Sequence, residues 1–112
     1  MYVPDCWAIL NVEKSPDEKY RRLIAGWYGG YLDGDSWRMN SGITKIVEET
    51  DYLDVYGFSG SVYRCMKHSQ RMSGLMSMIY ESFKDQVVAH GGSVSIEEYC
   101  FQQTDNGEKN GA

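Results

Sequence analysis

This 112-residue sequence lacks most of the features that reveal a protein's chemistry, and each absence excludes a class of protein. Cysteine is scarce: Cys6, Cys65 and Cys100 are odd in number and widely spaced, so no disulfide framework is indicated. We expect these cysteines to serve as small apolar residues in a reducing, cytoplasmic compartment.

Long apolar runs and an excess of positive charge are also missing. The sequence has no run of about 18 apolar residues, as a membrane span requires, and its first ten residues, MYVPDCWAIL, lack the basic segment of a secretory signal. We therefore expect a soluble, cytoplasmic protein with no membrane contact. The sequence has 11 Lys and Arg against 16 Asp and Glu. The resulting net charge of −5 argues against the binding of nucleic-acid phosphates as the main function.

Catalytic and cofactor motifs are incomplete wherever they begin. Cys65 and His68 are three residues apart, but they lack a third group to orient them and supply only two metal ligands. The segment 26–30 is rich in glycine without the Lys-Ser/Thr of a phosphate loop. The oxygens of 33–36 lack the closing Glu of a calcium loop. We predict no cofactor, no metal and no enzymatic activity.

One long segment, Ser69–Ala89, does have a clear helical period. Ser69 suits the start of a helix as an N-cap, and His90 followed by Gly91-Gly92 suits its end. The sequence therefore predicts a helix over about 69–89. Its apolar stripe consists of Met72, Leu75, Met76, Ile79, Phe83 and Val87.

The rest of the sequence predicts short strands, because apolar runs alternate with turn-forming residues. Residues 6–12 are apolar at both odd and even positions, which is typical of a strand covered on both faces. We predict a single α+β domain over residues 1–103, with five or six antiparallel strands in one curled sheet packed on the helix. The polar segment 104–112 is predicted to be disordered. These strands are expected near 6–12, 20–28, 43–49, 52–58, 61–67 and 93–103. Residues 37–39 begin a further strand pattern that is interrupted at 40–42 and is not counted among them.

The hairpin formed by 52–58 and 61–67 gives the most specific local prediction. If Ser59 and Gly60 are its two loop residues, Tyr56 lies opposite Tyr63 and Leu53 opposite Met66. One face of the hairpin would then carry Tyr52, Tyr56, Phe58 and Tyr63.

One helix covers one face of a sheet, so the aromatic face must either curl inward or remain open to a partner. Tyrosine suits an interface because it combines apolar area, few rotatable bonds and a polar tip. We therefore predict a small non-enzymatic interaction module that binds or inhibits another protein, or binds a second copy of itself. The residues expected to make the contact are Tyr52, Tyr56, Phe58 and Tyr63, with Trp37, Lys45 and Arg64 as neighbours.

Four other interpretations stay open. Cations interleaved with aromatics on strands, such as Arg38, Lys45 and Arg64, can stack the bases of single-stranded nucleic acid, although no RNP-type motif is present. A cavity between the helix and a curled sheet can hold a small ligand. An enzyme without a recognisable motif is the third. The aromatics can also be ordinary strand residues with no binding role.

Overall fold

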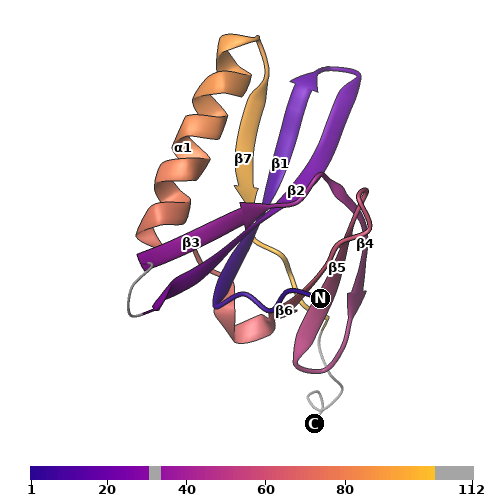
Figure 1. Ribbon diagram of the computed structural model, residues 1–112. Helices are drawn as coiled ribbons and strands as arrows, with labels where there is room; N and C mark the ends of the chain where they lie inside the picture. Colours follow the sequence, from indigo (N-terminus) through magenta and orange to yellow (C-terminus); the bar gives the residue numbers. More distant parts are fainter. Residues whose placement is uncertain (31–33, 103–112) are drawn as a thin grey trace, which may run out of the picture.

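The computed structural model describes residues 1–30 and 34–102, which form three layers (Figure 1). The layers are two antiparallel sheets, with strand orders β3-β2-β1-β7 and β4-β5-β6, and one helix, α1. The predicted α+β class is confirmed, with seven strands in two sheets in place of five or six in one. The elements are β1 (Cys6–Ser15), β2 (Glu18–Gly30), β3 (Gly34–Met39), β4 (Ile43–Glu48), β5 (Tyr52–Gly57), β6 (Val62–Met66), a 3₁₀ turn (Lys67–Ser69), α1 (Gly74–Ala89) and β7 (Ser93–Glu97).

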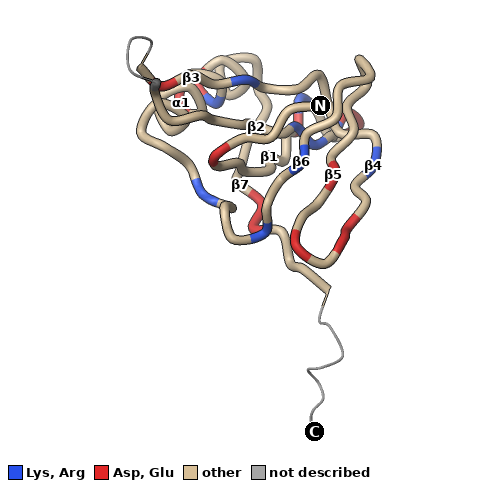
Figure 2. The backbone as a smooth tube through the Cα atoms, turned by 60° about the horizontal axis from the view of Figure 1, so that its bottom comes forward, with Lys and Arg blue, Asp and Glu red and all other residues tan. Residues whose placement is uncertain are grey.

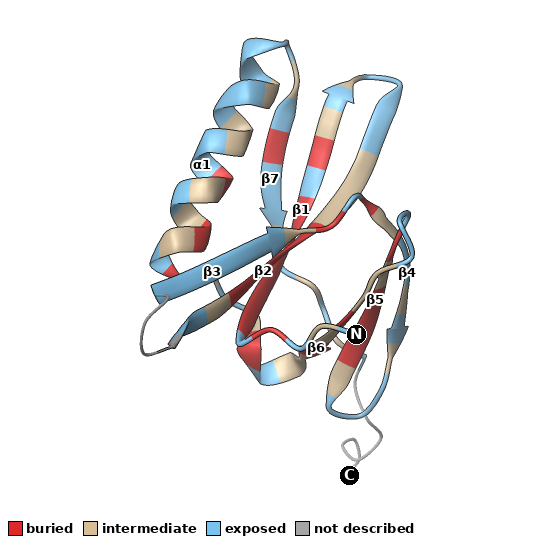
Figure 3. Cartoon of the chain, viewed as in Figure 1, coloured by how far each residue is buried: buried red, intermediate tan, exposed pale blue. Residues whose placement is uncertain are grey.

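Strand β1 lies at the centre of the fold and is covered on both faces, as its sequence predicts. Its even-numbered apolar residues contact α1, and its odd-numbered ones contact the three-stranded sheet. Figure 3 shows the buried residues running along β1, β2 and β5 between the layers. The four-stranded sheet is therefore the middle layer. The helix-side residues are Cys6, Ala8, Leu10 and Val12, and Trp7 and Ile9 lie on the other side.

The helix begins five residues later than the sequence predicts. Its N-cap is Ser73, whose hydroxyl accepts a 3.2 Å hydrogen bond from the amide of Met76. Ser69 instead ends the 3₁₀ turn and is buried. The residues in between are not helical, and the Arg71 amide donates to the Trp7 carbonyl at 3.0 Å. The predicted end is confirmed, since His90 caps the helix and Gly91 follows at φ +90°.

The predicted register of the β5–β6 hairpin is wrong by one residue. Its loop holds three residues, Phe58 to Gly60, because the Gly57 amide donates to the Ser61 carbonyl and Gly60 adopts φ +93°. Tyr63 consequently pairs with Val55, and Tyr56 pairs with Val62. A shift of one residue moves a side chain to the opposite face of a sheet. Tyr63 therefore points inward and is 3% exposed.

The C-terminal segment crosses one end of the space between the two sheets. The side-chain amide of Gln70 brackets Tyr99, accepting from its backbone amide at 2.7 Å and donating to its carbonyl at 3.3 Å. Phe101 packs edge-to-face on Trp7, with ring centroids 6.4 Å apart. Strand β7 ends at Glu97, short of the predicted 103. The predicted disorder of 104–112 falls outside the described residues.

Candidate interaction surface

The three-stranded sheet has one face against the four-stranded sheet and one face, here called the outer face, turned away from the rest of the described chain. Strand alternation and the observed register determine its members. The outer face consists of Lys45, Val47, Tyr52, Asp54, Tyr56, Val62, Arg64 and Met66. Most of these side chains are exposed or half-buried. The shortage of helical cover left two alternatives for the aromatic face, and Tyr52 and Tyr56 follow the open one whereas Tyr63 is turned inward.

Two cations of the outer face lie over two of its tyrosines. The Lys45 Nζ atom is 4.7 Å from the centroid of the Tyr56 ring, and the Arg64 Cζ atom is 4.1 Å from that of Tyr52. Both distances are within the range of cation–π attraction. In each pair the two residues come from neighbouring strands. Each of the two rings therefore has a cation contact within the sheet itself.

Asp54 orients Arg64 from the strand next to it. The guanidinium makes a two-pronged ion pair, with both N–O distances 3.0 Å. The hydrogen bond with Asp54 is the largest cause that raises the pKa of Arg64 above its ordinary value. Lys45 has no ion-pair partner among the described carboxylates. Figure 2 shows acidic residues gathered at the neighbouring β4–β5 turn.

The structure brings together four of the seven residues proposed from the sequence: Lys45, Tyr52, Tyr56 and Arg64. Three others lie elsewhere. Tyr63 is inside, Phe58 is 70% exposed at the tip of the β5–β6 loop, and Trp37 belongs to β3 in the other sheet.

Sequence reasoning missed four members of the outer face: Val47, Asp54, Val62 and Met66. Strand alternation identifies them once the loop length, and with it the register, is known.

The inner face of the same sheet holds two titratable groups in an apolar setting. Tyr63 stacks on Tyr2, with ring centroids 4.8 Å apart, and burial raises its phenol pKa. Cys65 is fully buried, and burial also raises the pKa of its thiol. Each group is thus kept protonated by the fold.

This burial predicts that the protein loses stability at alkaline pH. The unfolded thiol loses its proton near the ordinary value of 9.0, whereas the folded thiol keeps it. Below about pH 8.5, the Cys65 thiol should leave the free energy of unfolding unchanged. At higher pH, ionisation of this thiol in the unfolded chain should lower the free energy of unfolding by about 1.4 kcal/mol per pH unit. Urea unfolding between pH 7.5 and 10 measures the slope.

Cys65→Ala serves as the reference variant for this measurement. It should be less stable at neutral pH but have a flatter slope between pH 9 and 10. An unchanged slope in Cys65→Ala would mean that another group causes the loss.

Neither metal binding nor a membrane span is indicated in the part of the chain that the structure describes. Residues 1–30 and 34–102 contain no group of three His, Cys, Asp or Glu side chains placed to hold a metal ion. They also contain no helix long and apolar enough to cross a membrane.

No protein-family model matches the chain, and no curated protein or solved structure is detectably similar to it. The inference about function therefore rests on the outer face itself.

Proposed function

We propose that this protein is a small non-enzymatic interaction module that binds another protein through the outer face of its three-stranded sheet. The observation that carries the proposal is the pair of ordered tyrosines, Tyr52 and Tyr56, on a face that the described chain leaves without a covering layer. Tyrosine, arginine and methionine are enriched at protein interfaces. Tyr52, Tyr56, Arg64 and Met66 supply all three residue types on this face. A cytoplasmic location accompanies the proposal as a prediction from the sequence.

The outer face suits a protein better than single-stranded nucleic acid. Bases stack on free ring faces, but Lys45 already lies over Tyr56 and Arg64 over Tyr52. Asp54 neutralises Arg64, and the whole chain is acidic. Phosphate binding instead depends on unpaired cations. A protein partner contributes its own apolar side chains around the rings and needs no such excess of positive charge.

The test compares wild type with Tyr52→Ser/Tyr56→Ser in quantitative affinity purification from the native host. Each tyrosine acting as a hot spot contributes about 2 kcal/mol, so the double variant should bind its partner at least about 30-fold more weakly. Tyr28→Ser is the matched control, because Tyr28 is 49% exposed on the four-stranded sheet.

Light scattering of the purified protein distinguishes a second copy from a different partner. If the partner is a second copy, wild type has the mass of a dimer and the double variant that of a monomer. The proposal is wrong if the double variant captures the same proteins as wild type, to the same extent, and has the same mass in solution.

A further inference from the structure

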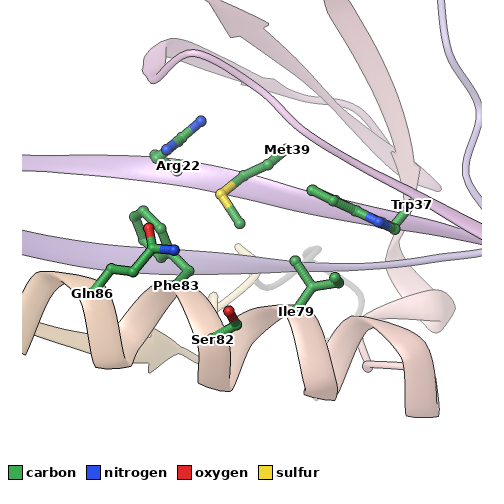
Figure 4. A pocket seen from close by; sticks show the side chains of 7 residues that line it. All are labelled: Arg22, Trp37, Met39, Ile79, Ser82, Phe83 and Gln86. Atoms are coloured by element: carbon green, nitrogen blue, oxygen red, sulfur yellow. The ribbon is translucent and has the colours of Figure 1, made fainter.

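A groove lies on the other side of the molecule, between α1 and the strands β2 and β3 (Figure 4). Arg22, Met39 and Trp37 line it from the sheet, and Ile79 and Phe83 line it from the helix. Its volume is about 350 Å³.

A second hollow of about 410 Å³ shares Phe83 and Gln86 with the first and extends past Val87 to Lys14 and His90. We call the two together the helix groove. Volumes of this size are in the range of binding sites that hold a few side chains.

The floor of the helix groove is apolar and only partly covered. Of the residues of α1, only Met76 and Tyr80 are buried against the sheet. Ile79, Phe83 and Val87 belong to the same apolar stripe but are half-buried. Across the groove, Trp37 is 41% exposed, which is unusual for so large an apolar ring. The chain therefore leaves part of the apolar side of its single helix without cover.

The charged groups around this floor are all cationic. Arg22 lies over Phe83, which both hollows share, and Lys14 lines the second hollow. Neither hollow has an Asp or Glu in its lining, although the chain has a net charge of −5. Lys14 is 3.9 Å from Glu18, but both side chains are largely exposed, so this pair is weak. The helix groove thus complements a ligand that is both apolar and negatively charged.

Arg22 is held in an orientation suited to an anion. Its Nε atom donates to the Asn40 carbonyl at 2.8 Å, and its guanidinium lies over the Phe83 ring, 5.2 Å from the centroid. No carboxylate in the described ranges forms an ion pair with it. Its terminal N–H groups are consequently available to a carboxylate, which a guanidinium binds in a two-pronged geometry.

We propose that the helix groove binds an acidic, apolar segment of a partner protein. A bulky apolar side chain of the segment lies between Trp37 and Phe83, and a neighbouring carboxylate accepts hydrogen bonds from Arg22. Because α1 and the three-stranded sheet cover opposite faces of the middle sheet, this site and the outer face lie on opposite sides of the molecule. The protein can then hold two partners at once. The proposal does not depend on the outer face being a binding site.

The test uses an acetylated and amidated decapeptide in which pairs of glutamate alternate with Phe-Leu, titrated into the ¹⁵N-labelled full chain. Amide shifts are expected along α1 and β2–β3, with an affinity that falls as salt rises. Arg22→Gln should weaken binding about tenfold or more, as expected for the loss of hydrogen bonds to a charged group. Trp37→Ser should weaken it severalfold.

Arg21→Gln is the matched control, because Arg21 lies on the opposite face of β2 and pairs with Glu97 at 3.1 Å. It should bind the peptide like wild type, and the same peptide with lysine in place of glutamate should not bind. The proposal is overturned if Arg22→Gln binds as well as wild type, if the lysine peptide binds equally well, or if no shifts occur in α1. Binding of laurate without binding of the acidic peptide also overturns it, since the occupant would then be a small amphiphile.

Discussion

Replacing Tyr63 by alanine is expected to lower the free energy of unfolding by about 3–5 kcal/mol, the usual loss for removing a buried aromatic ring. Tyr63 is 3% exposed and lies between the two sheets, where its ring stacks on Tyr2. Truncation leaves a cavity between packed sheets that cannot close without moving them. Urea unfolding monitored by circular dichroism measures the loss.

Tyr56→Ala is the matched control for this prediction. Tyr56 lies on the outer face, where its ring contacts Lys45. Truncation of this side chain therefore removes only cross-strand packing. The expected loss is about 1 kcal/mol or less. Equal losses at the two positions would contradict the register of β5 and β6, and with it the composition of the outer face.

The second large effect is expected for Trp7→Ala, which should cost about 3–5 kcal/mol for the ring alone. Trp7 is fully buried, and its indole Nε1 donates to the Met66 carbonyl at 2.7 Å. Losing that donor adds a penalty of about 1–3 kcal/mol if the carbonyl stays buried and unpaired. Since domains of this kind have a total stability of about 5–15 kcal/mol, Trp7→Ala should be unfolded or nearly so under native conditions.

Trp37→Ala makes the same chemical change at the helix groove. Trp37 is 41% exposed, so removing its ring should cost about 1–2 kcal/mol and leave a folded protein. A dispersed amide spectrum for Trp37→Ala beside a collapsed one for Trp7→Ala is the expected pair of results. A well-folded Trp7→Ala would mean that the two sheets do not depend on β1 for their packing.

The sequence predicts the main elements well because they depend on local patterns. The apolar stripe along α1 and the apolar residues on both faces of β1 are local patterns of the sequence, and burial follows from these patterns directly. The start of α1 is less certain from the sequence because Ser69 and Ser73 are equally good caps. Contacts of the preceding segment with Trp7 decide between them.

The division into two sheets could not be predicted, because it depends on one short connection. Asn40 is buried between β3 and β4, and its side-chain oxygen accepts from the amides of Leu23 and Gly42. That connection carries the chain from the four-stranded sheet to the three-stranded one. In the sequence, the same residues indicate only an interrupted strand.

The register error has a similarly local origin. Ser59-Gly60 fits a two-residue turn, and Phe58-Ser59-Gly60 fits a three-residue loop equally well, since both use Gly60 at positive φ. One added loop residue moves Tyr63 into the core and places Val62 and Arg64 on the outer face. The aromatic character of the face was thus predictable for Tyr52 and Tyr56, which lie on β5, but not for residues of β6.

Photo-crosslinking from the outer face tests the central claim most directly. Benzoylphenylalanine in place of Tyr56, irradiated in the native host, should yield a covalent product with a partner protein or a second copy. The same amino acid in place of Glu81, which is exposed on α1, should not yield that product. The result that would contradict the account is no covalent product from Tyr56, whether or not Glu81 captures a partner of the helix groove, because the outer face would then be unoccupied.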